Sequence, residues 1–215
     1  MYLIVIAKAP EPGRVKTRLC PPCTPEEAAA IAEAALADTL DAVRGVPGVE
    51  PVVVLDGTPG KWLPADLRVI RQRGSGLAER IAAAFADAGA PSLLIGMDTP
   101  QVEASRLTAA CQRLGSGDVD AVIGPAADGG WWAIGLTSAD PDVFAGIPMS
   151  TDRTFAAQKE RLRELALRFD VLPVLRDVDR ADDAAAVAAE MPGSRFACAV
   201  EASAIGRLAL GGPRS

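Results

Sequence analysis

Basic side chains cluster in the segment Lys8–Leu19, which reads Lys-Ala-Pro-Glu-Pro-Gly-Arg-Val-Lys-Thr-Arg-Leu. It holds two of only four lysines in the chain and two arginines, although the net charge of the chain is −6. Arginine binds phosphate oxygens through a fork of donors, lysine supplies a point charge, and glycine lets the backbone approach a ligand closely. We therefore expect phosphate binding by the following residues: Lys8, Gly13, Arg14, Lys16 and Arg18.

Two familiar phosphate-binding motifs do not fit the chain. In Gly13–Thr17 a valine replaces the glycine that precedes the lysine of a Walker motif. In Gly74–Glu79 a glutamate stands where a dinucleotide-binding fingerprint has its third glycine. The plain alternative is a solvated loop with incidental charge, so the segment by itself indicates only a phosphate-binding loop.

Asp98 lies in Gly96-Met-Asp-Thr-Pro100, directly after an expected strand. Magnesium commonly binds one or two carboxylates together with phosphate oxygens of a substrate. Asp98 is therefore a candidate ligand for a divalent cation. The alternative is that its carboxylate only caps a turn.

A second acidic loop ends in Asp128-Gly-Gly130 and is followed by two tryptophans. Asp128 could orient or deprotonate an acceptor hydroxyl, bind a metal, or simply form an Asp-Gly turn. Gly129 and Gly130 would offer free backbone N–H groups to an anion. In a strand, Trp131 and Trp132 would point to opposite faces, so we expect at most one of them in the site.

A third acidic segment reads Asp177-Val-Asp179-Arg-Ala-Asp-Asp183. Asp177 or Asp179 could contribute a metal ligand. The alternative is a helix start with acids near the positive end of the helix dipole, which we favour for Asp182 and Asp183.

Short apolar runs predict the strands that would position these loops. They are Tyr2–Ala7, Pro51–Leu55, Arg68–Arg71, Ser92–Gly96, Ala121–Gly124, Trp131–Leu136 and Val171–Val174. Strand and helix patterns alternate, which predicts an α/β fold with a central, mostly parallel (mixed) sheet between two helical layers. Ligands of such open sheets bind at the carboxyl ends of the strands. We expect one domain over residues 1–215, with 193–215 at its periphery.

Local signals predict the helices. Thr24, Pro25 and Glu27 form a capping-box pattern for a helix that runs to about Arg44. Apolar stripes predict three more helices, which contain Leu77, Ile81, Ala84, Phe85 and Ala88; Leu107, Ala110, Cys111 and Leu114; and Phe155, Leu162, Leu165 and Phe169. A short helix is expected over Ala199–Leu210.

Composition narrows the function classes. Hydrophobic residues make up 49% and charged residues 23%, as in a folded globular protein. The negative net charge argues against general binding to nucleic acid or anionic membranes. The chain has no histidine, which excludes imidazole bases and Ser-His-Asp triads. The N-terminal apolar run is too short for a signal peptide or a membrane span, so we expect a cytoplasmic protein.

Five sequence blocks occur together in an order typical of one family: Lys8–Leu19, Gly96–Pro100, Gly124–Gly130, Ile147-Pro-Met-Ser-Thr151 and Asp177–Asp179. Over about residues 2–183 the chain resembles bacterial candidate glycosyltransferases of the GT-A type. These are sometimes called radical-SAM/selenodomain-associated transferases and belong to the nucleotide-diphospho-sugar transferase superfamily. The chain departs from that pattern at Gly76–Glu79, at Met149, and at Cys20 and Cys23.

The resemblance implies a GT-A fold and roles for individual residues. Arg14, Lys16 and Arg18 would meet the nucleotide phosphates, and Lys16 and Asp128 would act in catalysis. Asp98 would hold Mg²⁺ or Mn²⁺. Further contacts are implied with the nucleobase for Gly76 and Leu77, and with the acceptor for Gly129, Gly130, Trp131, Ser150 and Thr151.

These patterns favour a metal-dependent glycosyltransferase that uses a nucleotide or nucleotide-sugar donor and a small-molecule acceptor. A nucleotidyltransferase that releases pyrophosphate, or a non-catalytic nucleotide-binding protein, would need much the same donor site. A thiol–disulfide protein built on Cys20-Pro-Pro-Cys23 is a further alternative, because thiolates are stabilised just before a helix. Against it, prolines crowd the segment and Thr24, not Cys23, carries the capping signal.

Overall fold

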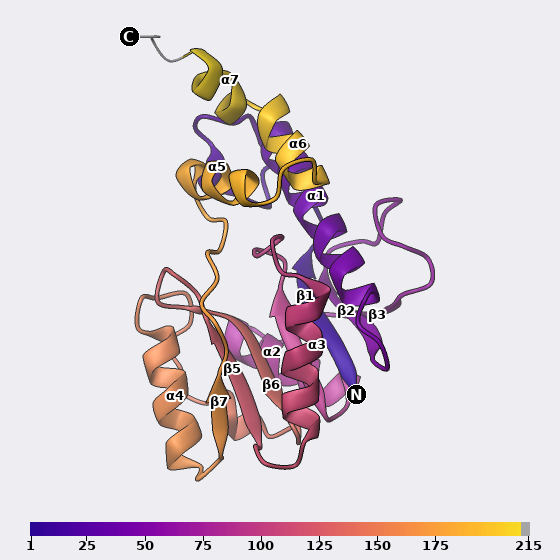
Figure 1. The fold of residues 1–215 in the computed structure, drawn as a ribbon, viewed down its shortest axis with the longest axis vertical. Helices are drawn as coiled ribbons and strands as arrows, with labels where there is room; N and C mark the ends of the chain where they lie inside the picture. The colour runs from indigo at the N-terminus through magenta and orange to yellow at the C-terminus, as the bar shows by residue number, and fades with distance from the viewer. Residues whose placement is uncertain (212–215) are drawn as a thin grey trace.

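A seven-stranded mixed sheet forms the centre of the computed structural model, which describes residues 1–211 (Figure 1). Its strand order is β3-β2-β1-β4-β6-β5-β7, and only β6 runs antiparallel to its two neighbours. The strands are β1 (Tyr2–Lys8), β2 (Glu50–Asp56), β3 (Arg68–Arg71), β4 (Ser92–Gly96), β5 (Ala121–Pro125), β6 (Trp131–Leu136) and β7 (Phe169–Val171). The predicted mostly parallel sheet is confirmed.

Helices connect most of these strands. They are α1 (Pro25–Arg44), α2 (Leu77–Ala88), α3 (Ala104–Gly115), α4 (Thr154–Glu164), α5 (Ala181–Glu190), α6 (Arg195–Ala202) and α7 (Ala204–Gly211), with short 3-10 helices η1 (Thr17–Leu19) and η2 (Pro141–Phe144). The predicted first helix is confirmed at both ends. Thr24 Oγ1 accepts from the backbone N–H of Glu27, and the Glu27 carboxylate accepts from that of Thr24.

Apolar side chains pack on both faces of the sheet, which gives the predicted three layers. On one face, α1 and α3 bury residues such as Leu36 and Leu107 against the strands. On the other face, α2, α4 and η2 cover the sheet, and the rings of Phe85 and Phe144 stack with centroids 5.6 Å apart. These layers hold the strand ends in fixed positions.

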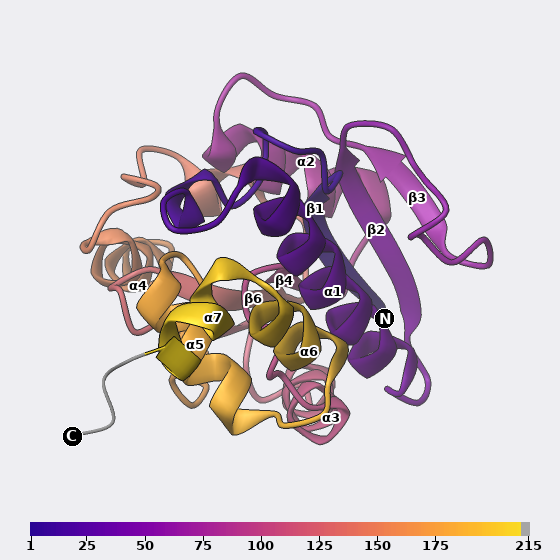
Figure 2. The same ribbon diagram turned by 90° about the horizontal axis from the view of Figure 1, so that it is seen from above.

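The C-terminal helices α5, α6 and α7 pack beyond the end of the sheet against α1 (Figures 1 and 2). Fully buried Phe196 of α6 lies in this cluster with Ile31 of α1. The same cluster contains Leu19 and Val178. It therefore joins the segment after β1 to the segment that leads from β7 into α5.

The structure corrects two predicted elements. The last strand is Phe169–Val171 rather than Val171–Val174, because Phe169 to Val171 pair with β5 while Val174 is 60% exposed. Phe169 therefore does not extend the apolar stripe of α4. That helix ends at Glu164, and Ala166 adopts a left-handed backbone conformation with φ 54°.

The expected short helix over Ala199–Leu210 is interrupted at Ser203, so that α6 and α7 are separate helices. Residues 212–215 of the expected peripheral segment lie outside the described residues. Within 1–211, no helix is both long and apolar enough to cross a membrane.

Candidate active site

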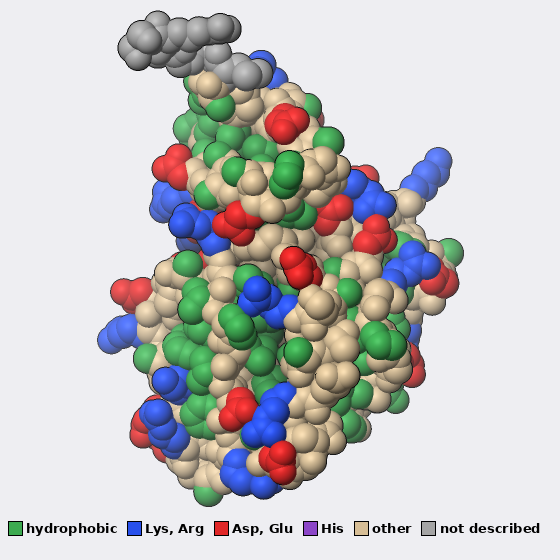
Figure 3. Space-filling model, in the orientation of Figure 1, with side chains coloured by type: hydrophobic (Ala, Val, Ile, Leu, Met, Phe, Trp, Pro, Cys, Tyr) green, Lys and Arg blue, Asp and Glu red, His purple; other side chains and the backbone are tan. Residues whose placement is uncertain are grey.

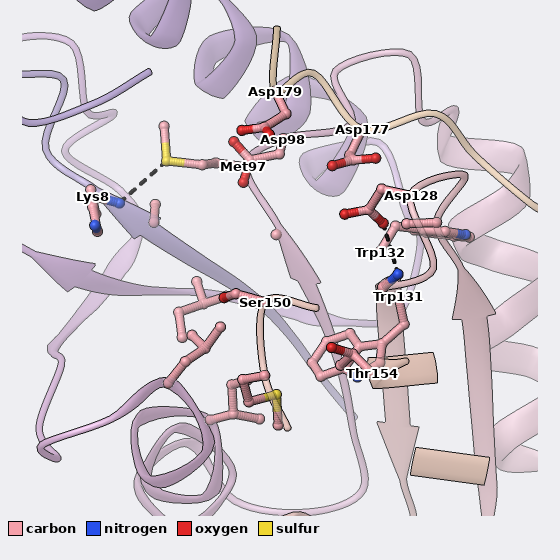
Figure 4. Close-up of a pocket in the computed structure, with 18 of the residues that line it drawn as sticks. Lys8, Met97, Asp98, Asp128, Trp131, Trp132, Ser150, Thr154, Asp177 and Asp179 are labelled. Atoms are coloured by element: carbon pink, nitrogen blue, oxygen red, sulfur yellow. Dashed lines mark hydrogen bonds between the residues drawn. The ribbon is translucent and has the colours of Figure 1, made fainter. Parts of the chain in front are cut away.

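A cavity of about 640 Å³ opens at the carboxyl ends of β1, β3 and β4 (Figure 4). Its walls come from the basic segment after β1, the loops after β3, β4 and β5, the segment Met149–Thr154, and the segment Asp177–Asp179. The loops that the sequence analysis singled out therefore meet in one place. This is the position that the topology of an open α/β sheet favours for a ligand.

Two apolar anchors fix the basic segment. Val15 is 5% exposed and Leu19 is fully buried, each in a different core cluster. The basic residues alternate with these anchors, and Arg14, Lys16 and Arg18 all line the cavity. The segment is therefore not a freely solvated loop.

Lys16 extends from this segment into the cavity wall and is the most enclosed of its basic side chains, with 6% of the side chain exposed. Its backbone is left-handed, with φ 48°. The ammonium donates to Asp98 Oδ1 at 2.5 Å and to the backbone carbonyl of Val178. Lys16 thus bridges the loop after β4 and the segment before α5.

The two arginines pair with acids at more exposed positions. Arg14 contacts Glu11 at 2.7 Å, and Arg18 contacts Asp179 at 2.5 Å. Asp179 raises the pKa of Arg18 through its hydrogen bond. Lys8, at the end of β1, lines the cavity without an ion-pair partner within residues 1–211.

The face of the molecule in Figure 3 carries acidic and basic side chains interspersed, without one large patch of either sign.

Asp98 lies on the loop after β4 with its side chain 54% exposed. Its backbone carbonyl accepts from the N–H of Val178 at 2.8 Å. Val178 is buried and anchors this segment. Its neighbours on either side, Asp177 and Asp179, both border the cavity. Figure 4 shows the carboxylates of Asp98, Asp177, Asp179 and Asp128 gathered on one side of the cavity. Helix α3 begins only at Ala104, so Asp98 does not cap it.

Asp177 is the acid most affected by its surroundings. Burial raises its pKa to about 6, and the negative charges of Asp128 and Asp98 add to this increase. A carboxylate with such a pKa can exchange a proton near neutral pH. From sequence, Asp177 was a candidate metal ligand or an acid at a helix start; its raised pKa could not be predicted, because the carboxylates that crowd it come from loops far apart in the chain.

Asp128 occupies the tight turn between β5 and β6. Its Oδ1 accepts from the backbone N–H of Gly130 at 2.7 Å, so the Asp-Gly turn expected as an alternative is present. The N–H of Gly129 donates to the carbonyl of Ala126 at 3.2 Å, so the prediction that both glycines offer free N–H groups is wrong. Both Asp128 and Gly130 line the cavity. Gly129 does not line it. A side chain there would overlap the carbonyl oxygen of Asp152, so Gly129 permits the close approach of two loops.

The tryptophans lie on opposite faces of β6. Trp132 is 3% exposed and donates from Nε1 to the carbonyl of Pro173 at 3.0 Å. Trp131 is less buried and packs with the cluster on the other face of the sheet. Both border the cavity, so the prediction that at most one would do so is wrong. Beyond Trp131 the wall contains Met149, Ser150, Thr151 and Thr154.

Gly76 and Leu77 also line the cavity, the latter 43% exposed. Gln72 and Arg80 also line the cavity and were not predicted from sequence. Gln72 directly follows β3, so it could have been found from the rule that ligands bind at the carboxyl ends of the strands. Its Nε2 donates to the carbonyls of Ala7 and Val54, at 2.7 and 3.0 Å.

Gly13 does not line the cavity; with φ 76° it forms the turn before Arg14.

The acidic side chains of the cavity suit a divalent cation whose remaining ligands come from a bound substrate. In the described part of the chain, no three Cys, Asp or Glu side chains are close enough to enclose a metal by themselves. Asp98, Asp128 and Asp177 nevertheless face one cavity together with basic residues. A cation completed by phosphate oxygens would need only one or two of these carboxylates.

The cysteines do not form a reactive pair. Cys20 and Cys23 are free thiols, and Cys23 is buried in the cluster of α1, α5 and α6. Burial raises the pKa of both thiols, which opposes formation of a thiolate.

Solved structures share this fold. A candidate nucleotide-diphospho-sugar transferase from Desulfovibrio desulfuricans G20 is 27% identical, with a TM-score of 0.80 over 98% of this chain and 95% of its own. CMP:2-keto-3-deoxy-manno-octonic acid synthetase complexed with CTP is 13% identical, with a TM-score of 0.56 over 89% and 98%. Rv0371c from Mycobacterium tuberculosis H37Rv, in complex with manganese, is 17% identical, with a TM-score of 0.54 over 86% and 97%. At these identities the last two show the fold alone.

No curated protein matches the sequence. A family profile described as "Uncharacterized protein conserved in bacteria (DUF2064)" matches residues 39–151. The match covers more than half of the chain, and the seven-stranded sheet is that of the nucleotide-diphospho-sugar transferases. The chain therefore belongs to the DUF2064 family of bacterial proteins and has the nucleotide-diphospho-sugar transferase fold.

Proposed function

We propose that this protein is a metal-dependent glycosyltransferase that uses a nucleotide-sugar donor and a small-molecule acceptor. The observation that carries the proposal is the cavity in which Arg14, Lys16 and Arg18 face Asp98, Asp128 and Asp177. Arginine and lysine bind the phosphates of a nucleotide donor, and carboxylates bind the divalent cation that such a donor carries, so one cavity holds the groups that both need. The likeness to the Desulfovibrio protein and the resemblance to radical-SAM/selenodomain-associated transferases support the same choice.

The residues divide into roles along the cavity. Lys8, Arg14, Lys16 and Arg18 neutralise the donor phosphates, and Asp98 is the ligand for Mg²⁺ or Mn²⁺. When bound, the divalent cation supplies further positive charge for the leaving diphosphate. The wall with Gly76 and Leu77 takes the nucleoside, and the wall with Trp131, Ser150 and Thr151 takes the acceptor. The manganese complex of Rv0371c, which has the same fold, agrees with a divalent cation in this role.

The transfer step requires a base for the acceptor hydroxyl. The acceptor oxygen forms a bond with the anomeric carbon while the bond from that carbon to the diphosphate breaks, and the nucleoside diphosphate leaves. The acceptor proton goes to a carboxylate. Asp128 is the candidate base, and Asp177, whose pKa is about 6, is the second candidate at the same site.

Binding tests the donor site directly. Calorimetric titration with nucleotides and nucleotide sugars in the presence of Mn²⁺ is expected to find a ligand for the wild-type protein. Asp98→Asn is expected to bind this ligand at least about tenfold more weakly, because the metal bound to the diphosphate loses its ligand. Glu103→Gln, which removes an acid near α3 outside the cavity, is the matched control and should bind normally. The proposal fails if no nucleotide binds the wild type, or if Asp98→Asn binds as well as the control.

A nucleotidyltransferase is the second candidate, because four basic residues, Lys8, Arg14, Lys16 and Arg18, suit a nucleoside triphosphate. Solved structures of this fold include UDP-glucose pyrophosphorylase from Acinetobacter baumanii, with a TM-score of 0.54 at 12% identity. Product analysis separates the reactions. Glycosyl transfer releases a nucleoside diphosphate, whereas nucleotidyl transfer releases pyrophosphate. A protein that binds nucleotide and releases neither would be a sensor.

A further inference from the structure

Three of the four cations of the basic segment are paired with acids, and only Lys8 has no ion-pair partner within residues 1–211. Arg14, Lys16 and Arg18 each hold an acid: Glu11, Asp98 and Asp179 respectively. The phosphates of a donor would therefore have to displace these carboxylates. How strongly each pair resists displacement depends on its exposure to water.

The two arginine pairs are easily opened. The side chains of Arg14 and Glu11 are 60% and 41% exposed, and those of Arg18 and Asp179 are 64% and 41% exposed. Pairs at such exposed positions contribute little net free energy, because water replaces either partner.

The Lys16–Asp98 pair is different. The Asp98 side chain is 54% exposed, but only 6% of the Lys16 side chain is, and its ammonium has a second oxygen partner in the carbonyl of Val178. Removing the partner of an enclosed charge leaves that charge uncompensated, which is strongly unfavourable. A phosphate on Lys16 would leave Asp98 as an unpaired acid beside Asp177. A cation on Asp98 would meet the ammonium of Lys16. Each ligand alone therefore faces a penalty that both together remove.

We infer that Lys16 and Asp98 act as internal counter-ions that are released together: phosphate takes the place of Asp98 on Lys16, and a divalent cation takes the place of Lys16 on Asp98. The inference rests on the proposed function, because it uses the phosphate and the metal of that site. It adds that the two ligands bind cooperatively through this pair. Coupling of this kind is reciprocal, so each ligand raises the affinity for the other by the same factor.

Mn²⁺ alone, without any phosphate, tests the metal half of the pair. Lys16→Met keeps an unbranched side chain and removes the counter-ion from Asp98. It is expected to bind Mn²⁺ about tenfold more tightly than the wild type, since the nearest positive charge is gone. Lys8→Met is the matched control. It removes the same charge from the same cavity but from a side chain without an ion-pair contact to Asp98 in the described residues. Its Mn²⁺ affinity should change by less than about threefold.

Inorganic pyrophosphate in the presence of EDTA tests the phosphate half. Asp98→Asn frees Lys16 and is expected to bind pyrophosphate about tenfold more tightly than the wild type without metal. Asp128→Asn removes an equal charge from the cavity without touching Lys16 and should produce a smaller gain. Circular dichroism and thermal unfolding check that each variant is folded.

The inference is overturned if Lys16→Met binds Mn²⁺ no more tightly than Lys8→Met, or if Asp98→Asn gains no more pyrophosphate affinity than Asp128→Asn. Either result would mean that the pair does not oppose the ligands. Failure of the proposed function is a separate outcome, in which the wild type binds no nucleotide even with Mn²⁺ present.

Discussion

At the scale of single residues, the candidate site combines an enclosed cation with a group of acids. The enclosed ammonium of Lys16 contacts Asp98, while Asp177 has the carboxyl group with the most perturbed pKa in the cavity. These residues follow different strands or precede α5, so the fold alone brings them together. Charges gathered in this way cost free energy in the absence of a ligand.

The raised pKa of Asp177 predicts a specific dependence of stability on pH. The ordinary pKa is 3.8 and the folded value is about 6, so between these values the native state binds more protons than the unfolded state. The contribution of Asp177 to stability is therefore greatest at low pH and is lost as the pH rises through about 6. Asp177→Asn cannot ionise and avoids this loss.

The measurement is the free energy of unfolding in urea for the wild type and Asp177→Asn, with EDTA present. The variant should gain about 1 kcal/mol relative to the wild type between pH 4 and pH 7, allowing for screening at this partly exposed position. A difference that is constant with pH would show that Asp177 has an ordinary pKa, and one that falls as the pH rises would show a lowered pKa; either result contradicts the prediction.

Part of the residue-scale picture could be predicted from sequence. The basic segment and Asp98 each follow an expected strand of a mostly parallel sheet, which predicts that both lie at the ligand-binding edge, and β1 and β4 are indeed parallel neighbours. The ion pair between Lys16 and Asp98 could not be predicted. It joins residues 82 positions apart, and its second acceptor, Val178, lies 162 positions away. Such contacts depend on the packing of Val178 into the core cluster that also contains Leu19 and Phe196.

At the scale of elements, the turn between β5 and β6 and the segment before α4 depend on a close approach that only glycine allows. Gly129 has φ 91°, and its backbone carbonyl accepts from the N–H of Phe155 at the start of α4. A Cβ there would overlap the backbone of Asp152. The turn that carries Asp128 is thereby held against the segment that carries Ser150 and Thr151.

Gly129→Ala is expected to lower the free energy of unfolding by about 2 kcal/mol more than Gly193→Ala. Gly193 is the matched control, because it also has a positive φ, 80°, but a Cβ there meets no atom within 4 Å. The comparison separates the backbone strain from the clash. Chemical denaturation measures both values, and equal losses would contradict the proposed contact between the loops.

The sequence predicted elements well where the signal is local. The capping box of α1 gave the start of that helix, since Thr24, Pro25 and Glu27 lie within one turn. The last strand was placed too late because Val171 to Val174 are apolar, whereas pairing with β5 selects Phe169 to Val171. Strand register depends on the neighbouring strand, which no local pattern contains.

At the scale of the whole molecule, the cavity depends on parts of the chain outside the family match at residues 39–151. The basic segment precedes the match, and Asp177–Asp179 follow it. The core cluster around Phe196 holds both, through Leu19 and Val178. The C-terminal helices therefore support the site at a distance, and we expect the chain to unfold as one domain.

Phe196→Ala tests this coupling. Phe196 is fully buried, so truncation is expected to cost about 3–5 kcal/mol of unfolding free energy and to weaken nucleotide binding as the two segments loosen. Leu208→Ala is the control, since Leu208 is 65% exposed and its loss should change stability by less than about 0.5 kcal/mol. If Phe196→Ala loses unfolding free energy as expected but binds nucleotide with unchanged affinity, the C-terminal helices do not support the site.

The most direct test of the central claim is a crystal structure of the protein with Mn²⁺ and the nucleoside diphosphate that binds best, with the metal located by anomalous diffraction. The account predicts a manganese peak beside Asp98, phosphate oxygens in contact with Lys16, and the Lys16–Asp98 pair opened. A nucleotide bound away from Lys8–Leu19, or Lys16 still paired with Asp98 in the presence of both ligands, would contradict it.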